Sequence, residues 1–374
     1  MEYQGARIDG LIAEGLGRIV VKDGSTLDSR GLITPKPLRE VTLSSATHLA
    51  APLEDPAVTA QVHKHYHRVT RDYVIARNRT RPNALSAFTA QFHPRGMRYV
   101  VNAATRAVAH LAERPSAVAS HFSAAALLGI TDFADDADSS LLGPYSRTIT
   151  SDVQLPTVRR APVNLPTWTL HLGERQLKVT PPMLTLAHCL RVVLSNEHAW
   201  RTPAGMPHAA TTVRAVQLID RFRREFGLAE KEVAEGLRGL VDKRKLGRIL
   251  ALSDGGADSP PETLVRLIAR HAVPELEWQS QVTVLKDGTI GDVDSDPATI
   301  LTVLDLAAIA ERRFVYYDGD HHLDRAQRDK DSHITAQLTA WGWGGIRVTA
   351  GMIDAVHQLN AHLRALSFPE SRAA

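Results

Sequence analysis

The feature that most constrains the fold is a change in hydropathy pattern near residue 260. From there onward, short apolar runs alternate with amphipathic stretches, which is typical of an α/β domain. The proline pair at 260–261 predicts the start of a helix. Further expected elements are strands at 281–285, 300–306, 313–317 and 345–349, a helix before the last strand, and a helix over about 352–366. The last third is therefore expected to form a mixed sheet flanked by helices.

The rest of the chain reads as an α+β region, and we assign the whole chain to the α/β class. Residues 1–100 show few clear elements, and residues 101–252 are expected to form a middle domain that ends in two amphipathic helices over 211–252. The small, polar segment 253–259 is expected to be a linker to a C-terminal domain over 259–374. Other expected elements are a helix over much of 61–77, helices within 101–130, strands near 167–172 and 177–179, and a helix over 183–193.

Composition excludes several kinds of chemistry without naming a partner. The chain carries 44 Lys and Arg against 41 Asp and Glu, and its formal charge of +3 is too small to identify a partner. A single cysteine, Cys189, excludes an internal disulfide, a zinc finger and an iron–sulfur cluster. It also favours a reducing, cytoplasmic location. No apolar run approaches the ~20 residues that span a bilayer, so no membrane partner is expected.

Positive charge is concentrated in one basic stretch, residues 61–99. Eight basic residues and one acidic residue give it a formal charge of +7, and five aromatic residues are interleaved. Such a pattern suits a surface that follows a phosphate backbone and stacks on bases. A solvated helix face with core aromatics is the alternative. The nucleic-acid contacts expected here are Arg68, Arg71, Arg77, Arg79 and Arg81.

Two aspartates lie on neighbouring predicted strands of the last third. Asp305 falls in the strand at 300–306, and Asp318 ends the next strand. Carboxylates at neighbouring strand ends can point at one site, and oxygen ligands of this kind suit Mg²⁺ or Mn²⁺. Glu262, in the first turn of the predicted helix, supplies another carboxylate. Metal-assisted hydrolysis of a phosphodiester needs a set of this kind.

Candidates for proton transfer and phosphate binding follow directly after Asp318. His321 and His322 are candidates for a general acid or base, because histidine is the side chain suited to proton transfer near neutral pH. The plain alternatives are a turn-forming aspartate, a solvated histidine pair and a wet helix face, and only the combination favours a site. The candidates for holding phosphates are Arg325, Arg328 and Lys330.

Short segments of the last third carry a family resemblance. They are SPPE at 259–262, VLDLA at 303–307, VYYDGDHH at 315–322, Arg-Asp at 328–329 and GWGGIR at 342–347. In this order and spacing they resemble the Vsr-like nucleases of the PD-(D/E)XK, restriction-endonuclease-like superfamily, as found in many actinobacterial proteins. The resemblance implies a mixed sheet flanked by helices and metal-dependent hydrolysis of DNA.

One position departs from that family. Tyr316 stands where the family usually carries a metal-binding Glu. Vsr-type mismatch nucleases are similar in lacking this carboxylate, and they use an Asp of the previous strand, a backbone carbonyl and a His two positions on. The matching places are Asp305, the carbonyl of Tyr317, and Asp318 in place of His. Two readings follow: catalysis survives without the Glu, or the site has decayed and only binds.

The middle region carries two shorter resemblances. AVASHFSAA at 117–125 and VTPPMLTL at 179–186 are similar to helices of AbiEi-like proteins, which include antitoxins of type IV toxin–antitoxin systems. Ordinary core helices carry the same apolar patterns. His121, within the first segment, is expected to be a core or capping histidine.

These observations together predict a Mg²⁺- or Mn²⁺-dependent DNA endonuclease that serves genome defence or DNA repair. Glu262 would orient water or a second metal, and the histidine pair would transfer protons. The alternative is an inactive, antitoxin-like DNA-binding regulator with a degenerate nuclease domain. DNA is the expected partner in both cases, and a second copy of the chain or other subunits of a defence system are further candidates. The expected metal ligands are Asp305, Asp318 and the carbonyl of Tyr317.

Overall fold

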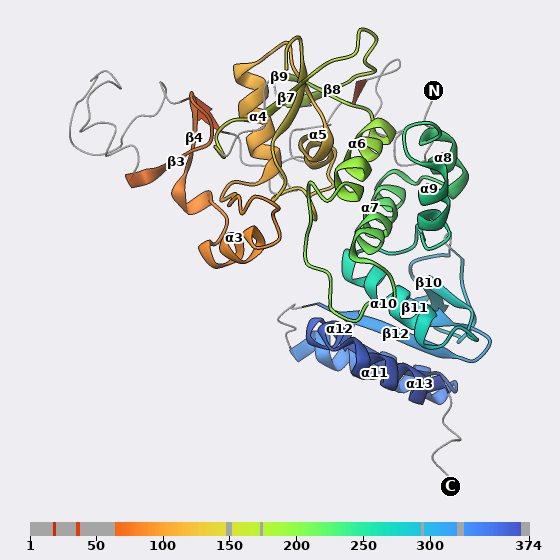
Figure 1. The fold of residues 1–374 in the computed structure, drawn as a ribbon. Helices are drawn as coiled ribbons and strands as arrows, with labels where there is room; N and C mark the ends of the chain where they lie inside the picture. The colour runs from red at the N-terminus through yellow and green to blue at the C-terminus, as the bar shows by residue number, and fades with distance from the viewer. Residues whose placement is uncertain are drawn as a thin grey trace. The chain divides into compact units, whose positions relative to one another are not determined.

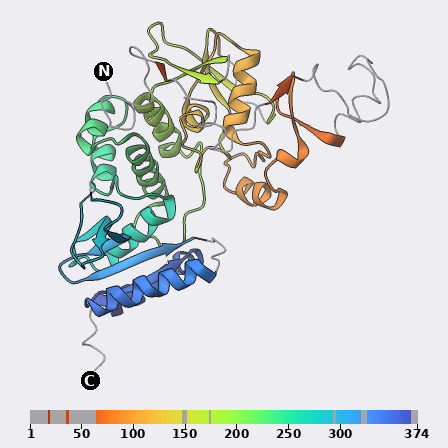
Figure 2. The same cartoon turned by 180° about the vertical axis from the view of Figure 1, so that it is seen from behind.

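The computed structural model shows an α/β chain in which helices and strands are mixed along the sequence (Figure 1), and Figure 2 gives the reverse view. Among the described residues, the strands form sheets of six, four and three strands. None of the helices within the described residues is both long and apolar enough to cross a membrane. The residues that the structure describes are 18–19, 35–37, 64–146, 152–172, 175–292, 295–319 and 325–367.

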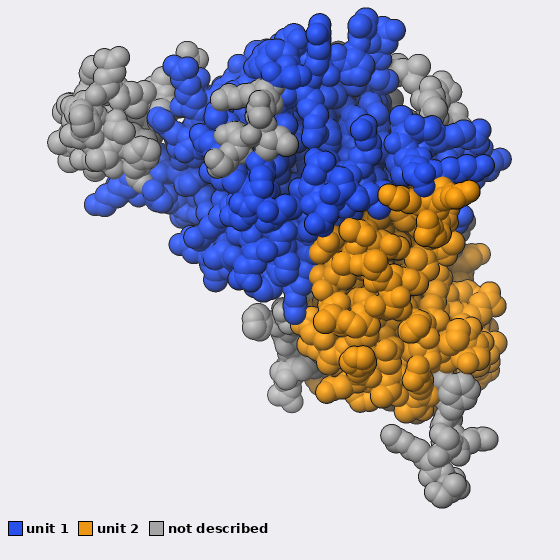
Figure 3. All heavy atoms as spheres, in the orientation of Figure 1, with its two compact units in different colours: residues 1–201, 225–243 blue, residues 202–224, 244–374 orange. Residues whose placement is uncertain are grey.

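The chain divides into two compact units, which Figure 3 colours separately. Unit 1 comprises residues 1–201 and 225–243, and unit 2 comprises residues 202–224 and 244–374. The three-part division expected from the sequence stays a prediction. The segment 253–259, expected to be a linker, lies inside unit 2, where the Ser253 hydroxyl and the Asp254 N–H donate hydrogen bonds to Asp220.

The larger sheet of unit 1 has the strand order β1-β8-β9-β5-β6-β7. Along β8, buried and partly exposed residues alternate, as expected for a strand with one face in the core. The antiparallel hairpin of β8 and β9 confirms the two strands predicted near 167–179. The strands of this sheet are β1 (Arg18–Ile19), β5 (Val118–Ala119), β6 (Ser140–Gly143), β7 (Thr157–Arg160), β8 (Trp168–Leu172) and β9 (Arg175–Val179).

Three predicted helices of unit 1 are confirmed, and their ends have clear causes. The helix α4 (Ala103–Glu113) begins after Asn102, whose side chain accepts the N–H of the third following residue. The helix α5 (His121–Leu127) is followed by Gly129, with φ of +96°. The helix α6 (Pro182–Leu194) starts with proline, whose missing N–H costs nothing at this position. The 3-10 helix η2 (Arg77–Arg79) and the helix α3 (Asn83–Ala90) precede them.

The helix predicted over much of 61–77 is wrong within the described residues. This part of the chain forms an antiparallel hairpin of β3 (Tyr66–Arg68) and β4 (Tyr73–Ala76). The strand β2 (Lys36–Pro37) pairs with β4 to complete a three-stranded sheet. Aromatic and β-branched residues are frequent in both strands and the turn, and such side chains favour a pleated, half-buried surface over a helix.

The two helices predicted over 211–252 are three in the structure. The helix α7 (Ala210–Phe226) is followed by α8 (Glu230–Gly236) and α9 (Lys243–Leu250). The break between the last two contains Gly239, whose φ of +77° lies in the left-handed region that glycine adopts readily.

The sheet of unit 2 has the order β10-β11-β12-β13 and is mixed, with antiparallel pairing except between β12 and β13. The helix α11 supplies the crossover that a parallel pair requires. The mixed sheet flanked by helices that the sequence predicted is confirmed, although the last predicted helix breaks at Ala355. The elements are α10 (Pro260–Ala272), β10 (Trp278–Leu285), β11 (Ile300–Ala308), β12 (Arg313–Asp318), α11 (Arg325–Ala340), β13 (Gly344–Thr349), α12 (Ala350–Asp354) and α13 (Val356–Ser367).

Apolar packing and one buried ion pair hold unit 2 together. Leu338 of α11 joins a core cluster with Phe314 and Trp343 beneath the sheet, and α10 packs against α13. Asp220 of α7 and Arg266 of α10, both side chains 1% exposed, form an ion pair at 2.6 Å. A buried charge requires such a partner, so the pair fixes α7 against α10.

Candidate active site

The candidate site lies where β11 and β12 separate, which we call the β11–β12 fork. The two strands pair over the last three residues of β11 and the first three of β12, and beyond Val315 β12 pairs only with β13. Asp305 is the first residue of β11 outside the pairing. Its Oδ2 accepts a hydrogen bond from the backbone N–H of Tyr317 at 2.7 Å. A carboxylate therefore satisfies a main-chain donor that the ladder leaves unpaired.

Glu262 lies in the first turn of α10, where free N–H groups and the helix dipole favour a carboxylate. Its Oε1 accepts a hydrogen bond from the Ser259 hydroxyl at 2.7 Å. Its Oε2 accepts the N–H of Asp258 at 2.9 Å and the side-chain amide of Gln281 at 3.0 Å. Three donors thus fix the orientation of this carboxylate.

Gln281 connects Glu262 to the sheet. Its φ of +55° is uncommon for a residue other than glycine. Gln281 is left out of the pairing between β10 and β11, whereas its neighbours Ser280 and Val282 pair with Leu306 and Leu304. By that register Gln281 stands across from Asp305. Backbone strain of this kind persists only where the surroundings enforce it, and it is concentrated at functional sites.

The carboxylates of Asp305 and Glu262 influence each other electrostatically. Burial, reinforced by the charges of Glu262 and Asp258, raises the pKa of Asp305 to about 7, although the hydrogen bond from Tyr317 opposes the shift. Burial also raises the pKa of Glu262. Like charges in a poorly solvated place are relieved by a proton or by a bound cation.

Asp318 lies at the end of β12, next to the positively charged side chain of Arg347. Arg347 of β13 approaches Asp318 at 3.9 Å and Asp331 of α11 at 3.2 Å. These three residues line a groove of about 950 Å³ along α11. The guanidinium of Arg347 also lies over the ring of Tyr316, 5.2 Å from its centre.

Tyr316, where the resemblance to Vsr-like nucleases leads one to expect a carboxylate, has a partner of its own. Its hydroxyl shares a hydrogen bond of 2.7 Å with the Thr302 hydroxyl. Burial raises the pKa of Tyr316 to about 12, so the side chain stays protonated at neutral pH. Tyr316 therefore offers no anionic oxygen to a metal.

The fork offers two carboxylates, those of Asp305 and Glu262, as possible metal ligands. Within the described ranges, no group of three or more His, Cys, Asp and Glu residues is arranged to hold a metal ion. Mg²⁺ commonly takes one or two protein carboxylates and fills its other positions with water or phosphate oxygens. Asp305, with one hydrogen bond from Tyr317, keeps lone pairs for a cation, whereas Glu262 already accepts three hydrogen bonds. Of the two carboxylates, Asp305 therefore has the larger remaining capacity to accept a ligand.

Several sequence-predicted residues are not brought to the fork. His321 and His322 lie outside the described residues. Tyr317 meets Asp305 through its N–H, and a role of its carbonyl as a metal ligand stays a prediction. Lys330 is exposed on α11, and only the backbone is described for Arg325 and Arg328, in the first turn of the same helix.

The predicted arginines of the basic stretch differ in their surroundings. Arg81 donates hydrogen bonds to Asp136 at 2.7 Å and to the carbonyl of Tyr99 at 2.9 Å. With a side chain only 12% exposed, it has a structural role. Arg68 is half-buried on β3. The exposed members are Arg71, Arg77 and Arg79.

Sequence reasoning missed Gln281 and Arg347. Gln281 stands in no recognisable motif, and Arg347 ends the GWGGIR segment without having been singled out as a site residue. Their placement depends on strand register, which brings Arg347 across from Tyr316 and Gln281 across from Asp305. If all possible registers of the expected strands had been compared, both residues would have appeared opposite a predicted site residue in one of them. No known protein family, curated protein or solved structure gives a significant match to this chain, so its function must be inferred from the site itself.

Proposed function

We propose that this chain hydrolyses phosphodiester bonds of DNA at the β11–β12 fork, with the help of a Mg²⁺ or Mn²⁺ ion. The observation that carries the proposal is the poorly solvated Asp305 beside Glu262, with a pKa of about 7 for Asp305. A protein rarely keeps such a pair without a proton or a cation to offset the repulsion. The resemblance of residues 259–366 to Vsr-like nucleases points to the same chemistry.

The residues of the fork would have distinct roles. Asp305 and Glu262 would hold the ion, which would supply an activated water and stabilise charge on the scissile phosphate. The Tyr317 N–H and the Gln281 amide fix the two carboxylates, and such support keeps ligands in position. Arg347, in the adjoining groove, would exchange its contact with Asp318 for a phosphate oxygen.

Support for DNA as the substrate comes from charge rather than from shape. Arg71, Arg77 and Arg79 are exposed on the basic stretch. Arginines of this kind neutralise phosphates and release counterions, which gives salt-dependent binding.

A second candidate is DNA binding without cleavage, and one observation favours it. Tyr316 holds Thr302 with its hydroxyl and lies beneath Arg347, so the place of the family's Glu is filled by a packed, neutral side chain. A decayed nuclease domain that serves an antitoxin-like regulator would have this appearance.

The test is plasmid cleavage by the full chain with Mg²⁺ or Mn²⁺. We expect nicking or linearisation by the wild type and its loss in Asp305→Asn. Glu311→Gln is the matched control, because Glu311 is an exposed carboxylate in the turn between β11 and β12. Cleavage that survives Asp305→Asn would remove the fork as the active site.

A further variant separates the two candidates. If neither the wild type nor Asp305→Asn cleaves but both bind DNA, the second candidate, DNA binding without cleavage, is supported. In that case Tyr316→Glu, which restores the family's carboxylate, should create metal-dependent cleavage.

A further inference from the structure

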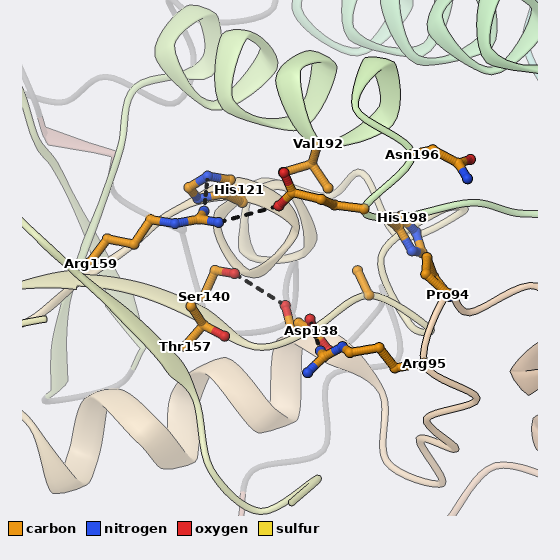
Figure 4. Close-up of a pocket in the computed structure, with 12 residues that line it drawn as sticks. Pro94, Arg95, His121, Asp138, Ser140, Thr157, Arg159, Val192, Asn196 and His198 are labelled. Carbon is orange, nitrogen blue, oxygen red and sulfur yellow. Dashed lines mark hydrogen bonds and ion pairs between the residues drawn. The ribbon is translucent and has the colours of Figure 1, made fainter. Parts of the chain in front are cut away.

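Unit 1 contains a cavity, lined by both charged and apolar side chains, that the proposed function does not use. It has a volume of about 230 Å³ and is lined by residues from the start of α5, from β6 and β7, and from the segments around Arg95 and Glu197. Figure 4 shows these side chains gathered around it. The volume lies below the ~300 Å³ at which sites for drug-sized ligands begin, so the occupant is small.

One wall of the cavity presents a guanidinium held from two sides. Arg159 of β7 donates from Nη1 to Nε2 of His121 at 2.8 Å and from Nη2 to Glu197 at 3.4 Å (Figure 4). Its side chain is 40% exposed, so the group is fixed yet accessible from the cavity. A pre-positioned guanidinium loses little freedom when it binds a ligand acceptor.

His121, which accepts the hydrogen bond from Arg159, has a strained backbone conformation. Its φ of +52° is strained for a residue with a side chain, and its ring stacks on His188 at 4.7 Å. Because an arginine only donates, Nε2 of His121 must accept, and Nδ1 carries the proton that faces the Ser120 hydroxyl at 2.9 Å. Burial and nearby positive charges lower the pKa of His121 well below its usual value, so the ring is neutral.

The facing wall presents a fixed carboxylate. Asp138 accepts hydrogen bonds from the Tyr99 hydroxyl at 2.7 Å and from Nε2 of His93 at 3.2 Å, and it forms an ion pair with Arg95. Although burial opposes ionisation, these bonds lower the pKa of Asp138 to about 2. The cavity therefore holds a permanent acceptor opposite the donor Arg159.

Two further polar side chains belong to the lining, Thr157 and His198. Thr157 of β7, only 7% exposed, brings a hydroxyl to the lining. His198 is 2% exposed and donates from Nε2 to the carbonyl of Phe133 at 2.7 Å. Its Nδ1 must then accept, but it is buried without a partner. Buried polar groups left in this state are costly unless something binds them.

We propose that this cavity binds a nucleobase, either in a free nucleoside or in a base extruded from a DNA strand. Two arginines and two carboxylates line it, paired as Arg159 with Glu197 and Arg95 with Asp138, so the lining carries no net formal charge. A neutral ligand that presents both donors and acceptors on one edge matches such walls. Arginine and carboxylate side chains read the donors and acceptors of bases in this way.

Other small ligands fit the same walls less well. A phosphate would bring its charge next to Asp138 and Glu197. A zwitterion such as glutamine would have to break one of the ion pairs that already neutralise the walls.

The test is equilibrium binding of the four deoxynucleosides to the full chain in EDTA. Inorganic phosphate and glutamine serve as comparison probes. We expect saturable binding of at least one nucleoside, tighter than that of either comparison probe. The same measurement is repeated with Asp305→Asn. Because all the lining residues belong to unit 1, binding should be unchanged in EDTA and in this variant, whether or not the proposed function is correct.

Pocket variants locate the binding. Arg159→Gln and Thr157→Val should each weaken nucleoside binding by about tenfold, the value of one hydrogen bond of ~1.4 kcal/mol. Arg160→Gln is the matched control, because Arg160 is the next residue of β7 and is exposed. Unchanged melting temperatures would show that the variants remain folded.

The two sources of the base are distinguished with a duplex that carries one unpaired 2-aminopurine. Fluorescence that rises on binding, and no longer does so in Arg159→Gln, identifies an extruded base, whereas binding of free nucleosides alone identifies a soluble ligand. The proposal is overturned if phosphate or glutamine binds more tightly than every nucleoside. It is also overturned if nothing binds, or if the pocket variants bind as the wild type does.

Discussion

Asp220 shows how one side chain can organise a polar core. Besides Arg266, its carboxylate accepts hydrogen bonds from Ser253, from the N–H of Asp254 and from Thr263. The carboxylate is thus satisfied by groups from α10 and from the segment before it. Full satisfaction is what makes a buried charge tolerable.

Breaking this ion pair should be costly. We expect Arg266→Met to destabilise unit 2 by roughly 3–5 kcal/mol, because it leaves Asp220 charged and buried. The double variant with Asp220→Asn should recover part of the loss. Chemical denaturation measures both, and Arg71→Met, at a side chain 88% exposed, should change little. Equal stability of Arg266→Met and wild type would contradict a buried, charged Asp220.

At the fork, a cation should stabilise the folded chain through Asp305. Binding at a concentration of about ten times the Kd contributes ~1.4 kcal/mol, seen as a melting temperature higher by a few degrees. We expect this rise with Mg²⁺ in the wild type and in Glu311→Gln, and its absence in Asp305→Asn. A rise of the same size in Asp305→Asn would place the cation elsewhere.

At the scale of elements, hydropathy periodicity identified most helices and strands. It failed where turn conformation and strand register determine the type or the end of an element. A helix is expected around β3 and β4, yet the aromatic and β-branched residues there form a hairpin. Likewise, the helix expected to continue past α8 stops at a left-handed glycine. Local pattern does not reveal such a backbone angle, because glycine is also tolerated inside helices.

Two glycines near this break offer a matched comparison. A Cβ added at either Gly239 or Gly247 would meet no atom within 4 Å, but only Gly239 has a positive φ, of +77°. We expect Gly247→Ala, inside α9, to stabilise by roughly 0.5–1 kcal/mol. Gly239→Ala should destabilise by about 1 kcal/mol, because alanine resists the left-handed region. Thermal denaturation tests the opposite signs, and a shared sign would refute the explanation from backbone conformation.

At the scale of the whole molecule, unit 1 should be sensitive to acid because of its histidines. Burial lowers the pKa of His188 and of His198 to about 4, and it lowers the pKa of His110 and His121 well below 6.5. As pH falls below 6.5, the unfolded chain takes up protons that the folded chain refuses. Stability is therefore lost from pH 6.5 down to about 4, by up to ~1.4 kcal/mol per pH unit for each histidine.

The variant His198→Gln checks this origin of the acid sensitivity. Glutamine keeps a donor near the position of Nε2, which bonds to the carbonyl of Phe133, but it does not titrate. Melting temperatures measured from pH 6.5 to 4.5 should fall less steeply in this variant than in the wild type. Identical slopes would show that His198 is not among the groups responsible.

Across the molecule, the sequence predicted the class of fold and the order of elements in unit 2, because apolar runs and turn residues recur there at regular spacing. It also singled out Asp305 and Glu262, and in the structure the charge of Glu262 helps to raise the pKa of Asp305. The partners that position them, Gln281 and Tyr317, depend on register and on the separation of two strands. The cavity of unit 1 was not anticipated, since its walls come from segments far apart in the sequence.

The hydrogen bond between Tyr317 and Asp305 has a spectroscopic consequence. Most amide protons of a sheet are held by carbonyls, whose state does not change, but this one is held by a side chain that can ionise or take a ligand. In an NMR spectrum the amide resonance of Tyr317 will therefore move with whatever occupies the fork. One backbone signal thus serves as an internal gauge of the site, readable without substrate and without turnover.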